Sequence, residues 1–135
     1  MTTYKEFYTE VFNELDIPVN GHTLNAFAIV SILEGINSYW NPLNSVIKVT
    51  GSKDLPGNSA KVQMYADFKM GVAGTVALLK QPRWQWVVLD SQFAGNRNQI
   101  LHEFDVQYQS WGSKLDWFSH TTPQANERLA LTMKS

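Results

Sequence analysis

One stretch of this sequence, residues 23–44, constrains the fold more than any other. It begins as a long apolar run and ends in a polar turn that contains tyrosine, tryptophan and proline. Between Asp16 and Lys48, Glu34 is the only side chain that carries a full charge at neutral pH. The sequence therefore predicts a nearly all-apolar, buried helix with a single carboxylate at its end.

The bounds of this helix are expected from its capping residues. After a turn at Asn20-Gly21, Thr23 can cap the first turn, Gly35 can provide a left-handed stop, and Pro42 prevents continuation. Glu34 then lies on the last turn, where the helix dipole opposes its negative charge and burial would raise its pKa further. A carboxyl that is partly protonated near neutral pH can act as a general acid. The alternative is an ordinary solvated glutamate at a helix end.

The length and composition indicate one globular domain over residues 1–135, with 44% hydrophobic and 17% charged residues. The net charge of −1 gives no electrostatic reason to expect nucleic acid or an anionic membrane as a partner. The chain has no cysteine, and its three histidines are scattered, so we expect neither a metal nor another cofactor. The first ten residues have no apolar core flanked by positive charge, so no signal peptide and no membrane insertion are expected.

Further helices are expected on both sides of the central one. Thr3 and Glu6 form a capping box for a first helix that ends near Asp16. Asp67 caps a helix over 68–80, and Gly71 and Gly74 inside it indicate that another part of the chain packs closely there. Three more helices are expected over 82–89, over 98–108 and from Thr122, the last with apolar contacts from Leu129, Ala130 and Met133. The core is expected to include Trp84, Trp86 and Trp117.

The helical pattern is interrupted between Gly35 and Asp67. Two short β-type runs, 46–50 and 61–65, flank a segment rich in turn formers at 51–58. We therefore expect a mainly α (α+β) fold with a small β-hairpin or loop region after the central helix.

In chain order the sequence has an apolar helix that ends in Glu34-Gly35, then Trp40-Asn41-Pro42, a small polar β region and a helix that contains Gly71 and Gly74. This order resembles the lysozyme-like superfamily, in particular its goose-type and soluble lytic transglycosylase branches. In those proteins a core helix ends in the catalytic glutamate and Asn-Pro follows, as Glu34 is followed here by Trp40-Asn41-Pro42. The chain is most similar to lysozyme-like modules of bacteriophage endolysins and tail proteins. The matching pieces, which span residues 23–113, are Glu34-Gly35, Asn41-Pro42-Leu43-Asn44-Ser45, Pro56-Gly57-Asn58, Lys61-Val62-Gln63-Met64-Tyr65, Gly71-Val72-Ala73-Gly74-Thr75 and Ser110-Trp111-Gly112. Lys61 and Met64 depart from the glycine and asparagine of that pattern, and the residues after Lys114 have no counterpart in it.

The resemblance implies a lysozyme-like helical domain that cleaves the β-1,4 bond between N-acetylmuramic acid and N-acetylglucosamine in bacterial peptidoglycan. Glu34 would protonate the departing glycosidic oxygen. If an anhydro sugar forms, the same carboxylate acts as base on the muramic 6-hydroxyl; plain hydrolysis commonly uses a second carboxylate. Asp54 is the nearby acid that could serve, although Lys-Asp-Leu-Pro-Gly is also an ordinary turn sequence.

The same resemblance points to residues that could contact the glycan strand. Aromatic faces stack on sugars and amides bond to N-acetyl groups, which makes substrate-binding candidates of Tyr39, Trp40, Asn41, Asn44, Gln63 and Tyr65. A core role is an alternative for Trp40 and Tyr65, and helix termination is an alternative for Asn41-Pro42. Phage tail or virion proteins are further candidate partners, which implies location in the virion or in the host cytoplasm before release. The main rival is an inactive lysozyme-like phage structural or interaction protein; a small-molecule-binding helical domain rests only on the surplus aromatic residues.

Overall fold

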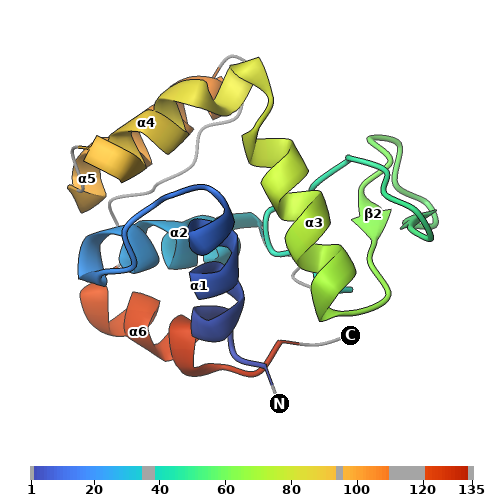
Figure 1. Ribbon diagram of the computed structural model, residues 1–135, viewed down its shortest axis with the longest axis horizontal. Coiled ribbons are helices and arrows are strands. Elements are labelled where there is room, and N and C mark those ends of the chain that lie inside the picture. The colour runs from blue at the N-terminus through green and yellow to red at the C-terminus, as the bar shows by residue number, and fades with distance from the viewer. Residues whose placement is uncertain (1, 35–38, 94–95, 110–120, 134–135) are drawn as a thin grey trace.

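The computed structural model describes residues 2–34, 39–93, 96–109 and 121–133 (Figure 1). Within these ranges the fold is mainly helical with one two-stranded sheet, as the sequence predicted. In chain order the elements are α1 (Tyr4–Glu14), α2 (Gly21–Glu34), β1 (Lys53–Asp54), β2 (Gln63–Met64), α3 (Phe68–Leu79), the 3-10 helix η1 (Pro82–Trp84), α4 (Gln85–Phe93), α5 (Arg97–Gln109) and α6 (Thr122–Ala130). No helix in the described ranges has the length and apolar character needed to cross a membrane.

The central helix α2 begins two residues before the predicted cap. The Asn20 side chain accepts hydrogen bonds from the backbone N–H groups of His22 and Thr23, each at 3.0 Å, and so serves as the N-terminal cap. Thr23 instead donates its hydroxyl to the Pro18 carbonyl at 2.6 Å. Asparagine is at least as good an N-cap as threonine, which explains the earlier start. Gly35, the predicted stop, lies outside the described residues.

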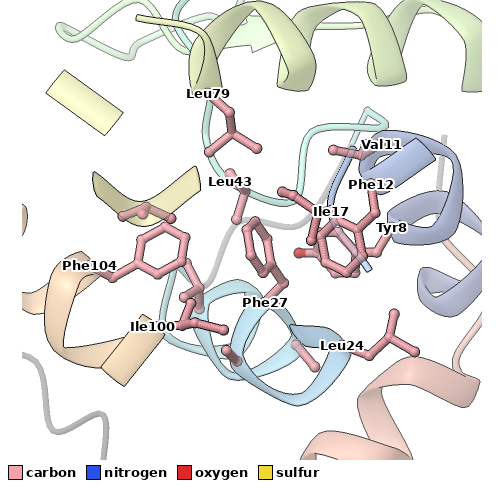
Figure 2. Close-up of a cluster of buried hydrophobic side chains, with 14 of the residues drawn as sticks. Tyr8, Val11, Phe12, Ile17, Leu24, Phe27, Leu43, Leu79, Ile100 and Phe104 are labelled. Atoms are coloured by element: carbon pink, nitrogen blue, oxygen red, sulfur yellow. The ribbon is translucent and has the colours of Figure 1, made fainter. Parts of the chain in front are cut away.

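The core is one cluster of buried side chains drawn from all six α-helices of the described chain. Phe27 of α2 lies at its centre, between Phe12 of α1 and Phe104 of α5, with ring centroids 4.8 Å and 5.3 Å away (Figure 2). The edge-to-face arrangement of these rings is the one that aromatic quadrupoles favour. Because residues 23–31 of α2 are all buried, this helix is surrounded by the others. The carboxylate at its end is therefore carried by the most buried element of the fold.

The loop between α2 and α3 differs from the prediction in one respect. Residues 46–50 form no strand, because the chain turns back immediately: the Ser52 N–H donates to the Val49 carbonyl at 2.9 Å, and Gly51 adopts a φ of +90°. The pairing occurs after this turn, where Lys53 of β1 faces Met64 of β2 in an antiparallel register. The second predicted strand, 61–65, does contain β2.

The loop packs closely against α3, as the two glycines of that helix predicted (Figure 1). Asp67 caps α3 by accepting from the Met70 N–H at 2.8 Å. A Cβ atom at Gly71 would overlap the Trp40 backbone carbonyl, and one at Gly74 would overlap the Tyr65 ring. Only glycine lets the backbones of the loop and the helix approach this closely.

Three predictions for the second half of the chain need correction or lie outside the described residues. Trp84 is buried as predicted, but Trp86 is 55% exposed because it projects from the outer side of α4. In α6 the inward residues are Ala125 and Leu129, with Met133 buried just beyond the helix, whereas Ala130 is exposed. Trp117, the third tryptophan expected in the core, falls within residues that the structure does not describe, as does the Ser110-Trp111-Gly112 motif.

The first and last parts of the described chain are joined. Thr3 and Thr132 form an antiparallel β-bridge, flanked by hydrogen bonds from the Tyr4 N–H to the Leu131 carbonyl and from the Met133 N–H to the Thr2 carbonyl. The two ends of the described chain therefore lie side by side (Figure 1).

Candidate active site

Glu34 is the last residue of α2, and its carboxyl group is mostly buried. The Asn44 side chain donates its Nδ2–H to Glu34 Oε2 at 2.7 Å and also lies 3.2 Å from the Glu34 backbone carbonyl. The other carboxyl oxygen, Oε1, is buried and has no hydrogen-bond partner among the described residues. The two oxygen atoms of this carboxyl group thus differ in hydrogen bonding: Oε2 accepts from Asn44, and Oε1 accepts from no described residue.

The pKa of Glu34 is raised to about 7, because burial removes water from the charged form. The hydrogen bond from Asn44 acts in the opposite direction and lowers the pKa, but by less. This carboxyl therefore exchanges its proton near neutral pH, as an acid-base catalyst must.

Tyr39 and Trp40 follow the undescribed residues 35–38 with backbone φ angles of 57° and 59°, in the left-handed region. The Tyr39 side chain is 40% exposed and remains available to a ligand. Trp40 is only partly buried, and its ring meets the Phe68 ring edge-on at a centroid distance of 6.3 Å. Of these two predicted contacts, Tyr39 is at the surface and Trp40 is shared between the surface and the core.

Asn41 has a different role from the expected substrate contact. Its side chain is buried, and it donates to the Ser45 carbonyl at 3.0 Å and the Gln63 carbonyl at 2.8 Å. Its Oδ1 accepts from the Ser45 N–H at 2.7 Å. All its polar atoms are thereby used to hold the loop closed onto β2.

Gln63 and Tyr65 are also interior residues whose polar atoms are bonded within the fold. Gln63 accepts from the Ser52 hydroxyl at 2.8 Å and donates to Asp54 Oδ1 at 2.7 Å. The Tyr65 hydroxyl bonds to Ser45 Oγ at 3.0 Å and to the Ile47 carbonyl at 2.7 Å. Burial corrects the expectation that Asn41, Gln63 and Tyr65 line an open cleft: in this structure they brace the loop that carries Asn44.

Sequence reasoning did not single out Ser45, which connects these residues. Its hydroxyl donates to the Gly74 carbonyl at 3.1 Å, and its backbone bonds to the Asn41 side chain. The Asn-x-x-x-Ser spacing was the available signal, since it lets one side chain reach the backbone four residues later.

Asp54, the candidate second carboxylate, is an exposed residue of β1. Its Oδ1 accepts from Gln63 and lies 4.0 Å from Lys48 Nζ. The hydrogen bond from Gln63 thus links the Asp54 side chain of β1 to β2.

Three surface depressions are formed by described residues, and Glu34 lines none of them. The first, of about 760 Å³, lies between α1, the start of α2 and α6, and the second, of about 510 Å³, adjoins it at Gly21 and Asn25. The third, of about 210 Å³, lies between Ile32 and α6. Since α2 rises 1.5 Å per residue, the α2 residues that line the first two, Gly21 to Asn25, lie about 14–20 Å along the helix from Glu34. Residues 35–38, which follow Glu34 directly, are outside the described ranges.

Across the described ranges, no three His, Asp or Glu side chains gather as metal ligands would. Comparison of the chain with protein-family models, with curated proteins and with solved structures gives no match.

Proposed function

We propose that this chain is a glycosidase that cleaves the β-1,4 bond between N-acetylmuramic acid and N-acetylglucosamine in peptidoglycan, with Glu34 as the general acid and base. The observation that carries the proposal is the Glu34 carboxyl itself, which ends the most buried helix and has a pKa of about 7. The identity of the substrate rests on the ordered motifs that resemble lysozyme-like phage modules. We also propose that the protein reaches the cell wall either as part of a phage virion or from the host cytoplasm, where it accumulates before release.

A single carboxyl can carry out the reaction. The protonated Glu34 gives its proton to the glycosidic oxygen as the bond from that oxygen to muramic C1 breaks. The muramic 6-hydroxyl then forms a bond to C1, and its proton passes to the Glu34 carboxylate. The acid is regenerated, the product is a 1,6-anhydro sugar, and no water is consumed.

The contacts of Asp54 favour this one-carboxyl mechanism. The exposed Asp54 carboxylate accepts a hydrogen bond from Gln63 and lies close to Lys48. Both proton transfers are therefore assigned to Glu34. Glu34→Gln is expected to abolish activity and Asp54→Asn to keep it within about threefold, since the asparagine still offers an oxygen to Gln63.

The test is the loss of turbidity of purified bacterial cell walls with four proteins: the wild type, Glu34→Gln, Asp54→Asn, and the exposed glutamate variant Glu127→Gln as a matched control. Mass analysis of the released muropeptides identifies the chemistry, because an anhydro end is lighter than a reducing end by one water. Equal clearing by the wild type and Glu34→Gln would remove the role of Glu34. No clearing by any of the four would favour the inactive lysozyme-like scaffold.

A further inference from the structure

The Asn44 side chain forms hydrogen bonds to two atoms of Glu34. The Asn44 amide nitrogen contacts both the Oε2 atom and the backbone carbonyl oxygen of Glu34. One NH₂ group can supply both bonds because it carries two hydrogen atoms. The side chain of Glu34 is thereby fixed relative to its own backbone at the end of α2.

Asn44 is itself held in position by its surroundings. Its backbone has a φ of 52°, in the left-handed region that asparagine tolerates better than most residues. Its N–H donates to the Asn41 carbonyl at 3.4 Å, and its neighbour Ser45 is bonded to the Asn41 side chain. The amide is therefore presented by a braced loop.

The Asn44–Glu34 pair leaves one side-chain oxygen of each residue unused. Glu34 Oε1 and Asn44 Oδ1 are both buried without a hydrogen-bond partner among the described residues. Buried polar atoms without partners destabilise a fold, so a proton on Glu34 Oε1 or a donor to Asn44 Oδ1 would be favourable. Glu34 Oε1 can therefore carry the proton, and Asn44 Oδ1 can accept a hydrogen bond from a substrate.

We infer that Asn44 is a positioning residue for Glu34: its amide nitrogen holds Oε2 as a hydrogen-bond acceptor and leaves Oε1 as the oxygen that gives and takes up the proton. A carboxyl oxygen that accepts a short N–H bond cannot easily carry the proton as well, since two hydrogens would then face each other. The inference rests on the proposed function for the use made of the proton. The geometry that assigns the proton to Oε1 is independent of the substrate.

Among the described residues, one titratable group is coupled to Glu34. Tyr8 of α1 is the titratable residue that interacts electrostatically with Glu34, and it stays neutral because burial raises its pKa far above the physiological range. Desolvation and the Asn44 bond are the causes that act on Glu34 itself. A change at Asn44 should therefore be read directly in the Glu34 titration.

The experiment is a carbon-13 NMR titration of the Glu34 carboxyl in the full chain, in the wild type and in Asn44→Gly and Asn44→Asp. Glycine keeps the left-handed backbone and removes the amide, while aspartate keeps the shape and exchanges the donor for a negative charge. The matched control is Lys61→Gly, an exposed left-handed position (φ 60°) in the same loop. We expect the pKa to rise by about one unit in Asn44→Gly and by more in Asn44→Asp, and to stay unchanged in Lys61→Gly.

If the wall assay is positive, the alkaline limb of the pH–rate profile should move with the NMR pKa in Asn44→Gly. In that variant kcat should fall at least about tenfold and KM should change less than about threefold, because the acid is misplaced and binding is kept. A folded Asn44→Gly with an unchanged Glu34 pKa, or an equal shift in Lys61→Gly, would overturn the inference. Because the titration needs no substrate, failure of the wall assay alone would count against the proposed function and not against Asn44.

Discussion

The phenol ring of Tyr65 occupies the space that a side chain at position 74 would need. This contact brings the backbone of α3 against the loop, where Ser45 Oγ bonds to both the Gly74 carbonyl and the Tyr65 hydroxyl. The loop that carries Asn44 is thus fixed to α3 at Gly74, in addition to the close contact of Trp40 with Gly71.

Gly74→Ala is expected to destabilise the fold by about 1–3 kcal/mol, because the added methyl group overlaps a fully buried ring that is bonded at its far end. Urea denaturation followed by circular dichroism measures the change. Gly21→Ala is the control, since nothing lies within 4 Å of a Cβ there. Equal stability of the Gly74→Ala variant and the wild type would show that the ring moves aside without loss.

Asn41→Ala should destabilise the chain by at least about 2 kcal/mol, because it leaves the Ser45 N–H and the Gln63 carbonyl without their side-chain partner. Amide hydrogen exchange should show lost protection at Ser45 before the helices α1 and α2 are affected. The exposed Asn13 of α1, changed to alanine, provides a control for the loss of an asparagine as such. Unchanged protection at Ser45 would contradict the bracing role of Asn41.

Glu34 should make stability depend on pH. Its pKa is about 7 in the fold and 4.5 when unperturbed, so the folded protein holds this proton more tightly than the unfolded chain does. The contribution to stability is complete below pH 4.5 and is lost as the pH rises through 7, and it amounts to about 3 kcal/mol at most.

The measurement is the free energy of unfolding from pH 4 to pH 8 for the wild type and for Glu34→Gln. The wild type should lose stability relative to the variant as the pH increases, because glutamine has no charge to bury. Glu127→Gln should run parallel to the wild type. Parallel curves for Glu34→Gln and the wild type would exclude a raised pKa at Glu34.

Two tryptophans of the η1–α4 segment provide a further test, since Trp84 is 3% exposed and Trp86 is 55% exposed. Trp84→Ala removes ring contacts with Phe104 and Tyr108 and should destabilise the fold by about 3–5 kcal/mol. Trp86→Ala should change stability by less than about 1 kcal/mol. Thermal melting of both variants, compared under the same conditions, decides between this arrangement and one in which both rings are buried.

The helices could be predicted from sequence because their signals are local. The capping box of Thr3 and Glu6, the Asp67 cap and the Thr122-Pro123 start each involve residues within a few positions of one another. The start of α2 was predicted wrongly because Asn20 and Thr23 are both acceptable caps, and the structure uses Asn20. Trp86 was assigned to the core because its residue type says nothing about which side of α4 it occupies.

The site was only partly predictable. Glu34 could be found because a lone charge at the end of an apolar helix is visible in the sequence. The roles of Asn41 and Gln63 could not be found, since their bond joins positions 22 residues apart. Amides and phenols bond equally well to sugars and to backbone, so residue type alone cannot separate a ligand contact from a brace.

The bridge between Thr3 and Thr132 makes the two ends of the described chain dependent on each other. The N–H of Tyr4, the first residue of α1, is satisfied by the Leu131 carbonyl just after α6, so shortening the C-terminal segment would also remove a partner from the first helix. Fraying at one end therefore exposes the other. We therefore expect the backbone around Thr3 and the backbone around Thr132 to lose protection from hydrogen exchange together.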